Sequence, residues 1–270
     1  MTSTTPSHSN IELIRALQEA RAHTLELVAD LSDGQMLGPR LAIVNPLRWE
    51  IAHVAWFQEY WVLRHLHRME PVWNEADQMY DSALIAHDTR WDLPLPSKAE
   101  TIGYMQRILD RVLKQMAAST ACEVTHKVNG YDEAYFLQLA LFHEDMHAEA
   151  ITYTRQTLGY PAPCITVGQD ILHTSAQTAS EESGKADAIS PSTPSLKGLG
   201  DAEVPGGTFR LGSTPDMPFV FDNEMWAHPV AVEPFAISRA VVTNAEFAAF
   251  VGDDGYRRPE FWDEEGWNEE

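Results

Sequence analysis

Apolar residues recur every three or four positions in four stretches of the first 160 residues, which is the spacing of amphipathic helices. The first stretch covers residues 12–31 and ends at the turn around Gly34. The second begins after Pro46, and its period places His53 on one stripe with large aromatic side chains. We therefore expect two helices before residue 70 and a histidine on the inner face of the second.

The other two stretches carry recognisable helix ends. Ser97 and Glu100 form a capping-box pattern in front of the third stretch. The fourth runs from 132 to 158 and is stopped by Gly159. Four such helices predict a helical bundle, and the interior of a bundle is a usual place for metal sites built from facing helices.

The pattern changes after the fourth stretch. Residues 171–202 are rich in Ser, Thr, Ala, Pro and Gly, which is typical of a flexible linker. Beyond them VPGGTFRLG and HPVAVEPFAISR alternate as β-strands do, and Thr243 with Glu246 predicts the start of a short helix. We predict an α+β chain with a bundle over 1–170, a linker, and the start of a mixed domain over 203–270. That second domain is still supplying aromatic and turn residues where the chain stops, so we expect it to be truncated.

The fourth stretch contains His143 and His147, which lie four positions apart and so leave one face of a helix. Their neighbours are mostly apolar, as expected near a packed interior where a neutral imidazole is a natural ligand. With His53 they would form a three-histidine metal site that leaves positions open for substrates. The alternative is a set of core histidines without metal. The flanking Glu144 and Glu149 could be ligands or could orient the ligands, but such glutamates are more often solvated or hydrogen-bonded at the rim, so we leave both out of the ligand set.

Composition narrows the choice of partners and compartment. The chain has 40 acidic against 19 basic residues, a formal charge of -21, which repels nucleic acids and anionic membranes. It has no run of about 18 apolar residues and no secretory-signal layout at its start. Cys122 and Cys164 are too few for a disulfide framework. We expect a cytoplasmic protein that binds neither nucleic acid nor membranes.

The connection between the second and third helices, MYDSALIAHDTRWDLPLPS, is a long loop of the kind in which recognition groups collect. Arg90 offers a planar fork suited to a carboxylate or to sugar hydroxyls. A surface salt bridge is an equally good interpretation of this arginine from composition alone.

Four motifs in order carry a family resemblance: WEIAHVAWFQEYWVLR, MYDSALIAHDTRWDLPLP, HEDMHAEA, and the series from VPGGTFRLG through FDNEMWAHPVAVEPFAISRAVVTNAEFAAFV. They resemble the iron-dependent sulfoxide synthases of ergothioneine biosynthesis across nearly the whole chain. The resemblance implies a DinB-like four-helix bundle followed by a C-type-lectin-like domain similar to formylglycine-generating enzymes. It also implies Fe(II) as the cofactor, held by His53, His143 and His147.

Two departures from that family concern the substrates. Met146 stands where a glutamine usually precedes the last histidine, and His87 stands where the family has the first of two arginines, the second being Arg90. Because charge-assisted hydrogen bonds contribute about 1.5–3 kcal/mol each, a dianionic thiol peptide should be bound less well. The loop is more similar to that of selenoneine synthases, which join hercynine to a selenosugar. We expect His87, Arg90 and Met146 to contact substrate.

The leading hypothesis is an Fe(II)- and O2-dependent enzyme that joins hercynine, trimethylated histidine, to a selenosugar through a carbon–selenium bond. The first alternative is carbon–sulfur bond formation with cysteine or γ-glutamylcysteine as the donor. A second is a DinB-type thiol S-transferase or hydrolase that uses zinc or nickel, and a third is a metal-free adaptor. The resemblance places the proton-handling and hercynine-binding residues late in the lectin-like domain, so the catalytic residues are not assigned within this chain.

Overall fold

The computed structural model describes residues 10–122, 127–166 and 200–268. The chain divides into two compact units. We call residues 1–184 together with 216–223 the helical unit, and residues 185–215 together with 224–270 the second unit.

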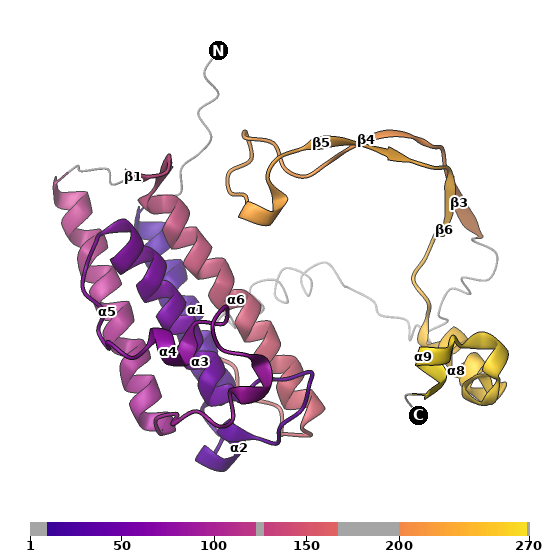
Figure 1. Cartoon of the computed structure of the whole chain (residues 1–270), viewed down its shortest axis with the longest axis horizontal. Coiled ribbons are helices and arrows are strands. Elements are labelled where there is room, and N and C mark those ends of the chain that lie inside the picture. The colour runs from indigo at the N-terminus through magenta and orange to yellow at the C-terminus, as the bar shows by residue number, and fades with distance from the viewer. Residues whose placement is uncertain (1–9, 123–126, 167–199, 269–270) are drawn as a thin grey trace, which may run out of the picture. The chain divides into compact units, whose positions relative to one another are not determined.

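The four long predicted helices are present in the helical unit, where they form the indigo to pink bundle of Figure 1. Helix α1 packs against α6 and α5, and α3 packs against the same two helices. The bounds of the long helices are α1 Asn10–Val28, α3 Leu47–Gln58, α5 Lys98–Cys122 and α6 Glu133–Thr157. Shorter elements join them: α2 Asp33–Leu37, α4 Asp77–Tyr80, the 3-10 turn η2 His87–Thr89, and an antiparallel hairpin of β1 Lys127–Val128 and β2 Tyr131–Asp132.

Local sequence explains where the long helices begin. The Ser97 backbone amide and hydroxyl both donate to the Glu100 carboxylate, as the capping-box pattern predicts. Asp132 caps α6 by accepting from the backbone amide of Tyr135 at 3.2 Å. One expectation needs correction, because the second helix does not continue as an α-helix past Gln58. Residues Glu59–Leu66 form the π-helix η1, whose wider backbone turn changes the spacing of the stripe.

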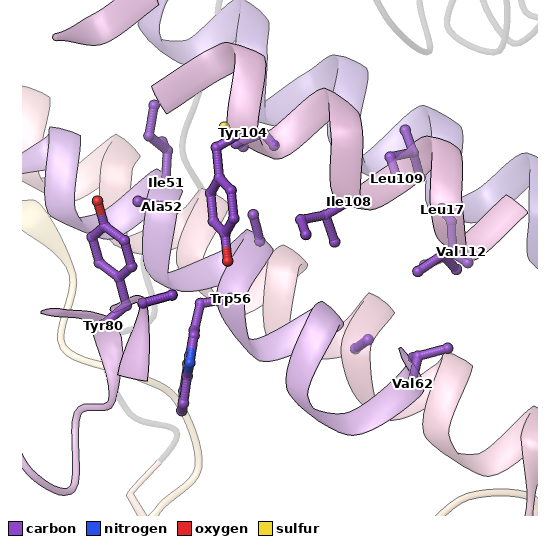
Figure 2. Packing of buried hydrophobic residues seen from close by; sticks show 14 of the residues in the cluster. Leu17, Ile51, Ala52, Trp56, Val62, Tyr80, Tyr104, Ile108, Leu109 and Val112 are labelled. Carbon is purple, nitrogen blue, oxygen red and sulfur yellow. The ribbon is translucent and has the colours of Figure 1, made fainter. Parts of the chain in front are cut away.

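The core of the helical unit fills the space between α1, α3, α5 and α6. Figure 2 shows Leu17 of α1 beside Ile108 and Val112 of α5, with Trp56 and Val62 from α3 and η1 below them. Leu17, Ile108 and Val112 have no exposed surface. These are positions that the sequence periodicity predicts to face inward, so the amphipathic stripes meet as expected.

A buried ion pair also crosses this core. The Nε–H of Arg21 donates to one oxygen of Glu144 at 2.7 Å, and an Nη2–H donates to the other oxygen at 3.1 Å. Arg21 further donates to the backbone carbonyl of Met105 at 2.6 Å. Both charged side chains are only 1–2% exposed. Glu144 is therefore hydrogen-bonded, but it lies inside the bundle beside Arg21 of α1 and not at the rim where we expected it.

The second unit contains the predicted strands and short helix. Strand β3 (Asp201–Val204) pairs antiparallel with β6 (Phe235–Ser238), and β4 (Gly207–Leu211) pairs antiparallel with β5 (His228–Val232). Helix α8 (Asn244–Gly252) begins at the predicted Thr243–Glu246 capping box. The 3-10 turns η4 Gly255–Arg257 and η5 Pro259–Phe261 and the helix α9 Glu264–Asn268 follow in the second unit. The 3-10 turn η3 Asp222–Glu224 begins in the segment 216–223 of the helical unit and ends at the first residue of the second unit's later segment.

The architecture is α+β, as predicted, with a helical domain followed by a small sheet-containing domain. Most of the predicted linker, residues 171–202, lies outside the described residues. Within the described part of the chain, none of the helices is both long enough and apolar enough to cross a membrane.

Candidate metal centre

Two packed helices bring three histidines together. His53 comes from α3, and His143 and His147 come from consecutive turns of α6. One nitrogen from each ring lies within 4.8 Å of the corresponding nitrogens of the other two. The contact between α3 and α6 thus joins positions that are 90 or more residues apart in the chain.

Two of the rings are oriented by acceptors behind them. Nδ1 of His53 lies 2.7 Å from the backbone carbonyl oxygen of Tyr80. Nδ1 of His147 lies 2.5 Å from Oε1 of Glu50, a carboxylate that is itself buried. A carbonyl and a carboxylate only accept, so both Nδ1 atoms carry the proton and both Nε2 atoms present a lone pair. This is the tautomer that a metal ligand needs.

His143 is held differently. Its ring stacks on Phe57, with centroids 3.6 Å apart and planes 6° from parallel. Its Nε2 lies 3.1 Å from Nε2 of His147. Its Nδ1 is buried and has no hydrogen-bond partner among the described residues. Stacking fixes the plane of this ring, and the described residues supply no acceptor that would fix its tautomer.

Burial keeps two of these rings uncharged. Removal from water, together with repulsion from His147, lowers the pKa of His53 to about 4. Burial likewise holds the pKa of His143 well below its ordinary value, with added repulsion from His147 and His53. Neutral imidazole is the form that binds metal. The site is therefore prepared to bind a cation near neutral pH.

Aromatic side chains from the same helix pack against His53. Trp49 stacks on it with centroids 4.7 Å apart and planes 9° from parallel, and Trp56 lies on the other side at 5.7 Å. The two indoles are fixed in turn, because Trp49 donates to the Met79 carbonyl and Trp56 donates to Asp77, each at 2.7 Å. The aromatic stripe that the sequence predicts thus packs against His53.

The chemistry of this donor set fits a transition-metal ion. Three imidazoles with converging nitrogens suit Zn²⁺, Fe²⁺ or Ni²⁺. The unpartnered Nδ1 of His143 indicates that hydrogen bonding within the described protein does not by itself account for this cluster. Three protein ligands leave coordination positions for substrates, which is the pattern of catalytic and not structural sites.

The loop residues singled out from the sequence lie in different environments. The Arg90 guanidinium stacks 3.9 Å above the Trp49 ring and donates to Oδ1 of Asn45 at 2.7 Å. Its Nε is buried and has no partner among the described groups. Arg90 and His53 therefore both contact the Trp49 ring. The described contacts of Arg90 are not those of a surface salt bridge.

The positions of His87 and Met146 do not indicate a substrate-binding role. His87 donates from Nε2 to the backbone carbonyl of Val44 at 2.7 Å, and its ring lies edge-on to Trp91. That nitrogen is engaged within the loop. Met146 directly precedes His147 on α6 and is 55% exposed. The structure brings neither side chain into the cluster of three histidines.

Sequence reasoning missed two supports of the cluster. Glu50 lies three positions before His53, and Phe57 lies four positions after it, so both share its helical face. A carboxylate inside the apolar run WEIAHVAWF was the available signal for Glu50, because a buried acid needs a partner. Nothing local indicated that this partner would be His147, 97 residues away.

Comparison with known proteins agrees with this architecture. The DinB superfamily model matches residues 16–151. The model of the sulfatase-modifying factor enzyme 1-like domain matches residues 190–270. The first match covers the helices that carry all three histidines, and the second covers the strands and helices of the second unit.

Curated relatives span both domains. The hercynine oxygenase of Mycolicibacterium thermoresistibile is 31% identical over 259 residues, which is 95% of this chain and 51% of the relative. That of Mycobacterium tuberculosis is 29% identical over 93% of this chain and 53% of its own length. The formylglycine-generating enzyme of M. tuberculosis is 48% identical over 54 residues, or 20% of this chain and 17% of its own.

The chain spans about half the length of the hercynine oxygenases that it matches. A three-histidine cluster between α3 and α6 lies in the DinB match, and a formylglycine-generating-enzyme-like domain follows it. The chain therefore belongs to the DinB superfamily, in the ergothioneine-type family that joins a DinB domain to a formylglycine-generating-enzyme-like domain.

Proposed function

We propose that this chain contributes the metal site of an Fe(II)- and O2-dependent enzyme that forms a carbon–selenium bond between hercynine and a selenosugar. The observation that carries the proposal is the cluster of His53, His143 and His147 within a chain that also has a formylglycine-generating-enzyme-like domain. The names of its relatives support hercynine as a substrate and oxygen as the oxidant.

In this proposal the three histidines hold Fe(II) through their Nε2 atoms. Glu50 and the Tyr80 carbonyl keep His147 and His53 in the required tautomer, and Phe57 fixes the plane of His143. When bound, Fe(II) supplies a centre that activates O2 and can accept a soft selenium or sulfur ligand. The stacked indoles of Trp49 and Trp56 limit water around His53.

The donor preference depends on the loop. His87 donates to Val44, which leaves Arg90 as the cationic fork beside the site. Met146 has no amide with which to bind a carboxylate. One guanidinium suits a donor with little negative charge, so we favour a selenosugar over γ-glutamylcysteine. The sulfoxide synthase reaction with a thiol donor is the alternative.

The test is anaerobic reconstitution with Fe(II), addition of hercynine with either a selenosugar or γ-glutamylcysteine, and mass spectrometry after O2 is admitted. The proposal predicts a selenium-containing adduct of hercynine that depends on O2 and is lost in His53→Ala. Coupling to the thiol alone would overturn the donor assignment. Equal turnover without O2, or with zinc in place of iron, would instead support a DinB-type thiol transferase.

A further inference from the structure

A second cavity lies beside the three histidines and is not used by the proposal above. It has a volume of about 350 Å³ and is bounded by the end of α3, by η1, by the β1–β2 hairpin and by the start of α6. Phe57 belongs to both places, because its ring lines the cavity and also stacks on His143. The volume is within the range of small-molecule sites.

The walls of this cavity are made mainly of rings. Several of these rings fix one another: Tyr131 stacks on Tyr135 at 4.2 Å, and Trp61 stacks on Phe136 at 6.1 Å. The six ring side chains are Phe57, Trp61, His65, Tyr131, Tyr135 and Phe136. Such a lining presents aromatic quadrupoles, and its polar groups include those of His65, Asn129, Asp222 and the two tyrosine hydroxyls.

The charge of the cavity is negative. Asp222, from the segment 216–223 of the helical unit, contributes an exposed carboxylate to the lining. This carboxylate accepts from the Asn223 backbone amide at 3.0 Å, and it helps burial and Tyr131 raise the pKa of Tyr135. His65 adds no positive charge near neutral pH, because burial, and secondarily Arg68, lower its pKa. Among the described residues, the lining contains no lysine or arginine.

We propose that this cavity binds a methylated ammonium cation. Rings attract a cation through their electron-rich faces, and a quaternary ammonium has no N–H group that would need a hydrogen-bond acceptor in the wall. Asp222 adds long-range attraction at the rim, and the net charge of -21 favours cations over the whole surface. The site is argued from the cavity alone and stands whether or not the donor assignment above is correct.

The test is calorimetric titration of the full chain with tetramethylammonium and with choline. The neutral isostere of choline, 3,3-dimethylbutan-1-ol, has the same shape without the charge. We expect saturable binding of both cations and at least about ten-fold weaker binding of the isostere. Equal affinity for choline and the isostere, or no saturable binding of either cation, would overturn the proposal.

Variants locate the binding. Trp61→Leu is expected to weaken tetramethylammonium binding about ten-fold, while Trp61→Phe retains most of it. Asp222→Asn is expected to weaken binding a few-fold, with Asp201→Asn, an exposed acid of β3, as the unchanged control. Thermal unfolding of each variant separates loss of the site from loss of the fold. Unchanged affinity in both Trp61→Leu and Asp222→Asn would place the binding elsewhere.

Competition with hercynine distinguishes two possible sources of the bound methylated ammonium group, namely the proposed substrate itself and a separate small cation. If it displaces tetramethylammonium from the wild-type chain and fails to do so in Trp61→Leu, the occupant is the substrate's own trimethylammonium group. If hercynine binds without displacing tetramethylammonium, the cavity takes a separate small methylated cation.

Discussion

The two units of the chain bury their side chains to very different extents. In the helical unit the four long helices enclose apolar side chains such as Leu17 and Ile108 completely. Among the described residues of the second unit, Gly255 alone is buried, and large side chains of the strands such as Phe209 and Ile237 are 58% and 57% exposed. Both units contain regular secondary structure, so regular backbone pairing does not by itself produce a core.

This difference bears on where a metal site can form. Metal ligands must be held in position by packing and by hydrogen bonds behind them. His53, His143 and His147 have such supports in Glu50, Tyr80 and Phe57. We therefore expect substitutions in the helical unit to have large effects on stability and metal binding, and substitutions on the strands of the second unit to have small ones.

The largest effect is expected from Arg21→Ala. It leaves the Glu144 carboxylate buried without its partner, and such a loss costs about 3–5 kcal/mol in the free energy of unfolding. Chemical denaturation followed by circular dichroism measures it. The matched control is Arg15→Ala on the same helix, whose ion pair with Glu19 is exposed to solvent and should contribute little to stability. Similar losses in the two variants would mean that the Arg21 pair is not buried.

Leu17→Ala comes next. Leu17 has no exposed surface and packs between helices, so the truncation should cost about 2–5 kcal/mol through lost burial and a residual cavity. The same denaturation experiment reports this loss. A cost below about 0.5 kcal/mol would contradict the packing of α1 against the bundle.

Glu50→Gln tests the support behind His147. An amide can present its NH2 to Nδ1 and no longer enforces the tautomer, so metal affinity should fall about 10–100-fold. Competition between the protein and a chromophoric chelator for Co(II) measures the change. Glu149→Gln is the control, since Glu149 is exposed on α6, two positions after His147. Equal Co(II) affinities of the two variants would show that Glu50 does not support the metal site.

The smallest effect is expected from Ile237→Ala. Its side chain is 57% exposed on β6, so the substitution should change the free energy of unfolding by less than about 0.5 kcal/mol. A loss above about 2 kcal/mol would show that this strand is buried in solution and would narrow the contrast between the units.

The sequence predicted much of the helical unit because its information there is local. Helical periodicity, the capping box at Ser97 and the stop at Gly159 identify the long helices, and the spacing of four residues places His143 with His147. Contacts between distant residues could not be obtained in this way. Glu144 meets Arg21 across 123 residues, which no local pattern indicates.

The π-helix η1 and the engagement of His87 with Val44 also escaped prediction. Both depend on how neighbouring segments pack, and intrinsic propensity carries no signal for either. The roles of His87, Arg90 and Met146 toward a substrate stay predictions, because the described contacts of these residues are with the protein itself.

The most direct test of the central claim is an anaerobic Fe(II) titration of the wild-type chain and of His53→Ala, His143→Ala and His147→Ala, with metal analysis after desalting. His228→Ala, in the second unit, serves as the control. The account predicts a single tightly bound ion in the wild type and the control, and loss of that ion in each of the three other variants. Undiminished binding in any one of those three would contradict a shared three-histidine site.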